Sequence, residues 1–295
     1  MTTMKRPTIA VLGLGWMGAA LADALIREGH DVVVWNRSAA KSEPFEGRAR
    51  RPATVLDAVR QSDVVMVCVR DYDASDEMLH TPDVSAALAG RTLVQFSSGT
   101  PQRAREAGHW AQESGVDYLD CTMSAGPQQV GTDQGTFHYT GPRGLFDSLS
   151  ELLTPLVGTS EYCGEEWGYA AALDFARLGT FTGVLTVLGT VFALMRSEGV
   201  SIDDFLPTVP FLSPEFMKGV VAATTADHYP SGTATLTTWE AWADQFVVAG
   251  REAGVDPRVA EVIRESLSRS IRQGHGAEDI YAIFSAFASA AGPGE

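Results

Sequence analysis

The sequence of 295 residues predicts an α/β domain with a doubly wound parallel sheet, followed by an all-α domain. Three observations predict this fold. Strand and helix signals alternate over roughly the first 120 residues. The strand-like runs are continuously apolar, which is typical of strands buried on both faces of a parallel sheet. Beyond about residue 164 only helical periodicity remains, so we expect two domains, 1–163 and 164–295.

The first domain is predicted to hold six strands, each a β-rich run. They are Thr8–Leu12, Asp31–Trp35, Asp63–Val69, Arg91–Phe96, Val116–Asp120 and Thr136–Thr140. Helical spacing of apolar residues lies between them, in Ala19–Glu28, Ala53–Gln61 and Pro101–Ser114. Gly29 is a typical residue after a helix end, and Thr100 is a typical N-cap before Pro101.

The second domain is predicted to be helical throughout. Its helices are a long one from about 168 to 197, then Trp239–Ala253, Pro257–Gln273 and Glu278–Ala290. Pro207–Pro214 and Asp227–Gly232 are predicted to be loops because they are rich in proline, glycine and other turn residues. The long helix would join the two domains.

An uncharged stretch of 18 residues, Leu178–Met195, lies on the long helix. Its length is near the lower limit for a membrane span, and a membrane helix is therefore one interpretation. It also contains three glycines and four threonines and continues a helix that carries charged residues earlier. One small domain could not cover so uniformly apolar a surface, so we expect burial against a second subunit in a homodimer, without a membrane.

The composition excludes several classes of function. There are 37 Asp and Glu against 22 Lys and Arg, a net charge of −15, and so acidic a surface repels nucleic acid and anionic lipid. The three cysteines have no metal-like spacing, which predicts a reducing compartment, neither disulfides nor a metal site. No secretory signal is visible at the start. We therefore expect a cytoplasmic protein.

The stretch from residue 13 to 18, GLGWMG, directly follows the first strand and opens a helix. Gly13 would permit the tight turn, Gly15 would let a pyrophosphate approach the backbone, and Gly18 would let helix and strand pack closely. The alternative is a merely structural turn. In this context the spacing predicts a dinucleotide site on a Rossmann domain, with Leu14, Trp16 and Met17 in the same loop.

The end of the second strand indicates which dinucleotide binds. An NAD site usually has Asp or Glu there for the ribose hydroxyl. Here the residues are Asn36, Arg37 and Ser38, followed by Lys41, one of only three lysines in the chain. A guanidinium, a hydroxyl and an ammonium suit the 2′-phosphate of NADPH. The alternative is a solvated basic loop.

Asp174 is the candidate catalytic residue. On the long helix it shares a mostly apolar face with Leu178, Phe181 and Leu185, and apolar surroundings favour a protonated carboxyl group that donates its proton. The alternative is a structural ion pair with Arg177, three residues later.

Other candidates line the expected substrate pocket. Ser98 follows the strand Arg91–Phe96, on the side of the sheet where ligands bind. The helical domain carries Trp239 and Trp242 on one helix, and Phe211 lies before it. At such spacing aromatic residues belong either to a pocket or to the core.

Taken together, these motifs resemble the imine reductases, relatives of the β-hydroxyacid dehydrogenases, over essentially the whole chain. The matching stretches are GLGWMG (13–18), VVWNRSAAK (33–41), CVRDYDA (68–74), LVQFSSGTPQRARE (93–106), the GP of HYTGP (138–142), WGYAAALDFARL (167–178) and AGVDP…GHGAEDI (253–280). The resemblance implies NADPH binding, reduction of an imine or iminium, and an interlocked, domain-swapped homodimer whose sites combine both subunits. It also implies cofactor contacts from Val69, Arg70 and Ser98, and a catalytic Asp174.

The nearest competitor is a β-hydroxyacid dehydrogenase-like alcohol or aldehyde oxidoreductase. That group uses a lysine on the first long helix, whereas residues 42–217 contain none. The chain nevertheless keeps Ser124 and Gly126, as those dehydrogenases do, whereas imine reductases more often have an apolar residue at the serine. Ser124 is a candidate residue of the substrate pocket, and the polarity of that pocket stays open. Some relatives that couple amines to ketones carry an asparagine at the position of Ser98. Reduction of a preformed imine is therefore expected ahead of the coupling of an amine with a ketone. A third interpretation is a redox sensor that binds NADPH without turnover.

Overall fold

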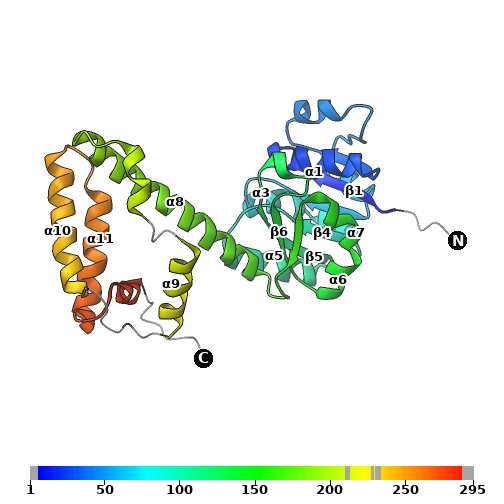
Figure 1. Cartoon of the computed structure of the whole chain (residues 1–295). Coiled ribbons are helices and arrows are strands. Elements are labelled where there is room, and N and C mark those ends of the chain that lie inside the picture. The colour runs from blue at the N-terminus through cyan, green and yellow to red at the C-terminus, as the bar shows by residue number, and fades with distance from the viewer. Residues whose placement is uncertain (1–5, 210–212, 227–228, 230–233, 288–295) are drawn as a thin grey trace. The chain divides into compact units, whose positions relative to one another are not determined.

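The computed structural model describes residues 6–209, 213–226, 229 and 234–287 (Figure 1). The chain forms two compact units, residues 1–179 and 180–295, and the division falls inside one long helix. Each unit has its own buried core and is described by itself.

The first unit is built on a seven-stranded sheet of order β2-β1-β3-β4-β5-β6-β7 (Figure 1). The strands are β1 Thr8–Leu12, β2 Asp31–Trp35, β3 Val64–Val67, β4 Thr92–Gln95, β5 Asp117–Ser124, β6 Thr136–Thr140 and β7 Thr159–Tyr162. All six predicted strands are present, and β7 was not predicted because it is a short, half-exposed strand at the sheet edge.

The prediction of a parallel sheet is confirmed for β1 to β5 and wrong for β6. β6 runs antiparallel to β5, whereas β7 is parallel to β6. The segment between β5 and β6 contains only the short 3₁₀ helix η2, Pro127–Gln129, and no crossover α-helix. A parallel neighbour needs such a crossover, so this connection can form only a hairpin.

Helices cover both faces of the sheet and explain its apolar strands. They are α1 Trp16–Arg27, η1 Ala39–Phe45, α2 Val55–Arg60, α3 Tyr72–Leu79, α4 Pro82–Leu88, α5 Pro101–Glu113, α6 Arg143–Ser148, α7 Ser150–Leu153 and η3 Thr154–Leu156. Along β1, Ile9 and Val11 enter one core, whereas Ala10 and Leu12 enter the other. The predicted burial of both faces is therefore confirmed.

Strand β5 carries a buried carboxyl group that is not among the predicted site residues. Asp120 on β5 is fully buried, and the hydroxyl groups of Tyr72 and Tyr118 donate hydrogen bonds to its Oδ1. Burial raises the pKa of Asp120 to about 7, against the smaller lowering effect of those two hydrogen bonds. Folding therefore favours the protonated form of this group.

The long helix α8 spans Gly168–Ser197, the range that the sequence predicts. Within the single chain several of its apolar side chains stay uncovered, with Phe181 60% and Leu185 52% exposed. Among the described residues it is the one helix long and apolar enough to cross a membrane by length and composition alone. The chain by itself therefore leaves this apolar surface unburied.

The second unit is helical, as predicted. After α8 come η4 Ile202–Asp204, η5 Leu206–Thr208, α9 Pro214–Ala226, α10 Leu236–Glu252, α11 Arg258–Ser270, the π-helical turn η6 Ile271–His275 and the 3₁₀ helix η7 Ile280–Phe287. Helix α9 was not predicted, and the predicted last α-helix is the 3₁₀ helix η7 as far as it is described. The predicted loops lie partly outside the described residues, at 210–212, 227–228 and 230–232.

Candidate active site

The glycine-rich turn after β1 has two glycines that packing requires and one that it does not. Gly13 has a φ of +98°, and a Cβ there would overlap the carbonyl oxygen of Cys68. A Cβ on Gly18 would overlap the carbonyl oxygen of Gly13. Around Gly15, by contrast, no atom lies within 4 Å of an added Cβ. This open space is where a pyrophosphate could approach the backbone.

Helix α1 begins at this open space without a side-chain cap. Its N-cap residue is Gly15, which has no side chain to bind the free N–H groups of the first turn. Those N–H groups and the positive end of the helix dipole together form an anion-binding site. The helix start therefore fits the pyrophosphate of a dinucleotide.

A groove of about 970 Å³ extends from this turn. Its lining includes all the cofactor-binding residues that the sequence predicts except Leu14, namely Gly13, Gly15, Trp16, Met17, Asn36, Arg37, Ser38, Lys41, Val69, Arg70 and Ser98. Leu14 is buried in the core, and its N–H donates to Asn36 Oδ1 over 2.9 Å. Asn36 Nδ2 in turn donates to the Ser38 carbonyl over 3.0 Å. Asn36 therefore ties the glycine turn to the loop after β2.

The cations of that loop differ in their ion pairing. Arg48, Arg50 and Arg51 pair with Asp23, Asp31 and Glu46, respectively. Arg37 and Lys41 form no ion pair with any residue that the structure describes. Two uncompensated cations on the wall of the groove suit a ligand with a dianionic phosphate.

Arg51 also lines a second hollow of about 380 Å³, which Asn36 and Arg37 share. Arg51 is not among the predicted site residues, because it lies ten residues beyond Lys41 and no motif marks it. In the folded chain Arg51 lines the same hollow as Trp35, the last residue of β2.

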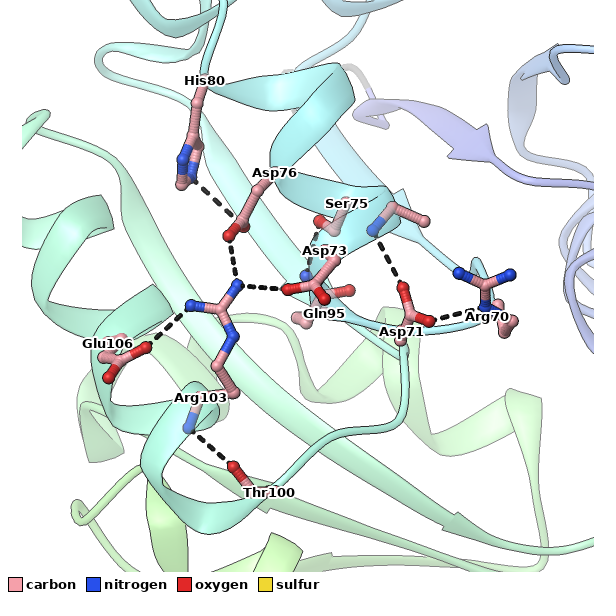
Figure 2. A network of polar contacts seen from close by, with 11 residues as sticks. Arg70, Asp71, Asp73, Ser75, Asp76, His80, Gln95, Thr100, Arg103 and Glu106 are labelled. Carbon is pink, nitrogen blue, oxygen red and sulfur yellow. Dashed lines mark hydrogen bonds and ion pairs between the residues drawn. The ribbon is translucent and has the colours of Figure 1, made fainter.

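The opposite wall of the groove comes from the loop after β3 and from α3. Val69 N–H donates to Ser97 Oγ over 3.1 Å, and Asp71 caps α3 by accepting from Ala74 N–H. Figure 2 shows how Arg103 of α5 then holds α3 in place.

Three carboxylates surround Arg103, two from α3 and one from its own helix. Its guanidinium contacts Asp73 at 3.0 Å, Asp76 at 2.5 Å and Glu106 at 2.7 Å (Figure 2). The hydrogen bond to Glu106, followed by that to Asp76, raises the pKa of Arg103 above its ordinary value. Sequence reasoning missed this clamp, which only the packing of α3 on α5 creates.

A cavity of about 400 Å³ adjoins the groove. Asp174, Ser98 and Ser124 all line it, so the structure brings together three predicted site residues from distant parts of the chain. The cavity and the groove have Phe96, Ser98 and Met123 in common. A ligand that fills the groove would therefore reach the edge of the cavity at these residues.

Asp174 forms the ion pair that the sequence analysis considered as the alternative. Arg177 Nη2 lies 2.5 Å from Asp174 Oδ1, and the Asp174 side chain is only 17% exposed. Both residues line the cavity. The Oδ2 atom of Asp174 has no hydrogen-bond partner among the described residues. The cavity thus contains a carboxylate with one oxygen available to a ligand.

Ser124 is linked to two side chains that the sequence analysis did not include. Its Oγ lies 3.1 Å from Nε2 of His138, and Nδ1 of His138 lies 2.9 Å from Oε2 of Glu161. Cys163 Sγ is 3.8 Å from the same Nδ1. These residues lie on and just after three neighbouring strands, so no local sequence signal connects them.

The side chains of His138, Glu161 and Cys163 each bring one potential ligand atom within 4.8 Å of the others. Two ligands of one tetrahedral zinc ion lie about 3.3 Å apart, given bonds of about 2.0–2.1 Å. The 2.9 Å between His138 and Glu161 is instead the length of a charge-assisted hydrogen bond. We therefore interpret the group as a hydrogen-bonded chain.

The predicted aromatic residues belong to the other unit. Trp239 packs against the core of the helical unit, whereas Trp242 is 50% exposed and stacks on Phe246 with ring centroids 5.3 Å apart. Phe211 lies outside the described residues. Trp239 therefore contributes to the packing of its own unit, and Trp242 presents its ring on the surface of α10.

Comparisons with known proteins identify the family. A family profile described as the NAD binding domain of 6-phosphogluconate dehydrogenase matches residues 8–164, and one described as the C-terminal domain of NADPH-dependent reductive aminase-like proteins matches residues 166–289. The solved imine reductase of Myxococcus stipitatus in complex with NADP+ is 31% identical, covers 96% of this chain and 100% of its own, and has a TM-score of 0.86. The chain belongs to the imine reductase family.

This imine reductase is also similar to two fungal enzymes. The NADPH-dependent reductive aminase of Aspergillus oryzae is 26% identical over 95% of this chain and 96% of its own. The reductive aminase of Aspergillus terreus, solved with NADPH and ethyl levulinate, is 29% identical, covers 96% of this chain and 100% of its own, and has a TM-score of 0.83. The prediction of an oxidoreductase with an N-terminal Rossmann domain is confirmed.

Proposed function

We propose that this imine reductase uses NADPH to reduce the C=N bond of a small imine or iminium to an amine. The observation that carries the proposal is the common wall of groove and cavity, at Phe96, Ser98 and Met123. NADPH, when bound, supplies the hydride. The protein places the substrate carbon in the cavity beside that wall and provides the charge that the nitrogen needs.

The choice of NADPH over NADH rests on the loop after β2. Arg37 and Lys41 carry no ion-pair partner among the described residues, and Ser38 adds a hydroxyl donor on the same groove wall. Of the two cofactors, only NADPH carries the 2′-phosphate that these groups would bind. The relatives solved with NADP+ and NADPH support this choice.

Asp174 is proposed to act on the substrate nitrogen. Arg177 occupies the Oδ1 atom of Asp174, and the Oδ2 atom of the carboxylate is available to stabilise an iminium electrostatically in the cavity. The alternative is direct or water-mediated proton donation by Asp174. The two roles differ in their response to substrate charge, because an already cationic iminium needs no proton.

A homodimer would complete the site. The exposed apolar side chains of α8, including Phe181 and Leu185, would pack against a second copy of the chain. We propose that the partner's helical unit covers the cavity with exposed aromatics such as Trp242, that no membrane is involved, and that the enzyme is cytoplasmic. We propose residues 1–163 as the NADP-binding domain and residues 164–295 as the helical domain that forms the dimer.

A screen of NADPH oxidation tests the activity. The panel contains cyclic imines, charged iminium compounds and pairs of a ketone with an amine, and 3-hydroxyacids with NADP+ test the dehydrogenase alternative. We expect oxidation with the cyclic imines and iminium compounds and none with the hydroxyacids, since no lysine lies between residues 42 and 217. If NADPH binds and no substrate accelerates its oxidation, the redox-sensor interpretation replaces this one.

A further inference from the structure

The reduction of a neutral imine consumes a proton that must enter the cavity. Asp174 already binds a cation in the cavity, because Arg177 Nη2 lies 2.5 Å from its Oδ1. Of the other groups on the cavity wall, Ser124 is hydrogen-bonded to an imidazole. Imidazole is the side chain best suited to proton transfer near neutral pH.

We propose that Ser124, His138 and Glu161 form a proton relay that delivers a proton to the substrate nitrogen. This inference rests on the proposed function. Glu161 orients the ring of His138 by accepting a hydrogen bond from Nδ1–H, His138 binds Ser124 through Nε2, and the hydroxyl group of Ser124 faces the substrate. Ser124 is the catalytic residue of the relay, and His138 acts through it.

The sheet places these residues in a row. His138 pairs with Thr122 of β5 on one side and with Glu161 of β7 on the other. Ser124 lies two residues beyond Thr122, and alternate residues of a strand share a face. The row runs from the cavity wall through His138, 19% exposed, to Glu161, 55% exposed. The row therefore begins at the cavity and ends at a carboxylate that contacts solvent.

As the substrate carbon receives the hydride, the Ser124 O–H proton passes to the substrate nitrogen, and the proton on His138 Nε2 passes to Ser124 Oγ. The imine is reduced to the amine, and NADPH is oxidised to NADP+. His138 is left neutral, with its Nδ1–H donating to Glu161. After the amine leaves, water in the cavity returns a proton to Nε2 through Ser124.

Cys163 provides a matched control beside the relay. Its Sγ is 3.8 Å from His138 Nδ1, the nitrogen that binds Glu161. Burial, and then the charge of Glu161, raises the pKa of Cys163, so this neighbour stays a neutral thiol. A change at Cys163 therefore disturbs the surroundings of His138 without removing a member of the relay.

The test compares two substrates of the full-length enzyme with NADPH. One is a weakly basic cyclic imine that is neutral at the assay pH, and the other is its N-methyl iminium, which needs no proton. His138→Gln and Ser124→Ala should each lower kcat for the neutral imine by about 10²-fold. Both should lower kcat for the N-methyl iminium far less than kcat for the neutral imine. Cys163→Ser should leave kcat unchanged with either substrate.

Two further measurements separate a relay from a structural effect. The double variant of Ser124 and His138 should be no slower than the slower single variant, because both changes break one chain. Glu161→Gln, at an exposed position, should fold and also slow only the neutral imine. Equal loss for both substrates, or no loss for the neutral imine, would overturn the relay. A wild-type enzyme that reduces neither substrate would instead overturn the proposed function, and the relay with it.

Discussion

Replacing Gly15 by alanine should weaken cofactor binding without weakening the fold. Gly15 has a φ of −68° and a ψ of −174°, a conformation that alanine adopts without strain, and no atom lies within 4 Å of the added Cβ. Removing a glycine at such a position stabilises a protein by about 0.4–1 kcal/mol. The new methyl group would occupy the space at the start of α1 where the pyrophosphate approaches.

The loss of affinity follows from the contacts that the methyl group displaces. Hydrogen bonds from N–H groups to a charged group contribute about 1.5–3 kcal/mol each, so the loss of one raises the Kd by about 10–150-fold. NADPH and NADH share the pyrophosphate, so both should lose affinity equally. Gly18→Ala is the matched control, because its Cβ would overlap the backbone of Gly13. Such overpacking costs about 1–3 kcal/mol.

Thermal unfolding without cofactor and fluorescence titration with each cofactor measure the two effects. Gly15→Ala should keep or slightly raise the Tm, whereas Gly18→Ala should lower it, by about 2–4 °C for each kcal/mol. The reasoning is refuted if Gly15→Ala binds NADPH with the wild-type Kd, or if it unfolds at the reduced temperature of Gly18→Ala.

Four other predictions follow from the same structure. Arg37→Ala and Lys41→Ala should each raise the Kd of NADPH by about 10–150-fold and hardly change that of NADH, and equal losses would indicate a structural role for the loop. Asp174→Asn should lower kcat by roughly 10²-fold with little change in NADPH affinity, and wild-type turnover would remove Asp174 from the mechanism. The pKa of Asp120 is about 7 in the folded chain, whereas that of an ordinary aspartate is 3.8. Its protonation therefore stabilises the fold below about pH 4, and this contribution is lost as the pH rises to 7. Denaturant unfolding should therefore show that the free energy of unfolding of the wild type, relative to that of Asp120→Asn, falls by at most about 4 kcal/mol between pH 4 and 7. A difference between the two proteins that stays constant over this range would contradict the raised pKa. Val187→Asp should abolish dimer and activity together in sedimentation and turnover assays, whereas a fully active monomer would refute the dimer.

The sequence by itself determined the features that arise from short-range patterns. The bounds of β1, β2 and β6 and of the long helix α8 agree with those predicted from apolar periodicity. The glycine spacing likewise located the turn between β1 and α1. These features depend on which residues lie beside one another in the chain, so a linear reading captures them.

Only the tertiary structure decided how distant segments pair. The antiparallel direction of β6 and the existence of the polar edge strand β7 depend on hydrogen bonds between strands, which local composition does not encode. The chain from Ser124 through His138 to Glu161 exists because β5, β6 and β7 are neighbours in one sheet. The cavity around Asp174 is likewise lined largely by residues more than 40 positions away in the sequence. The local sequence specifies single strands and helices. The candidate site depends on side chains from distant strands, and only the order of the strands in the sheet brings these side chains within hydrogen-bonding distance.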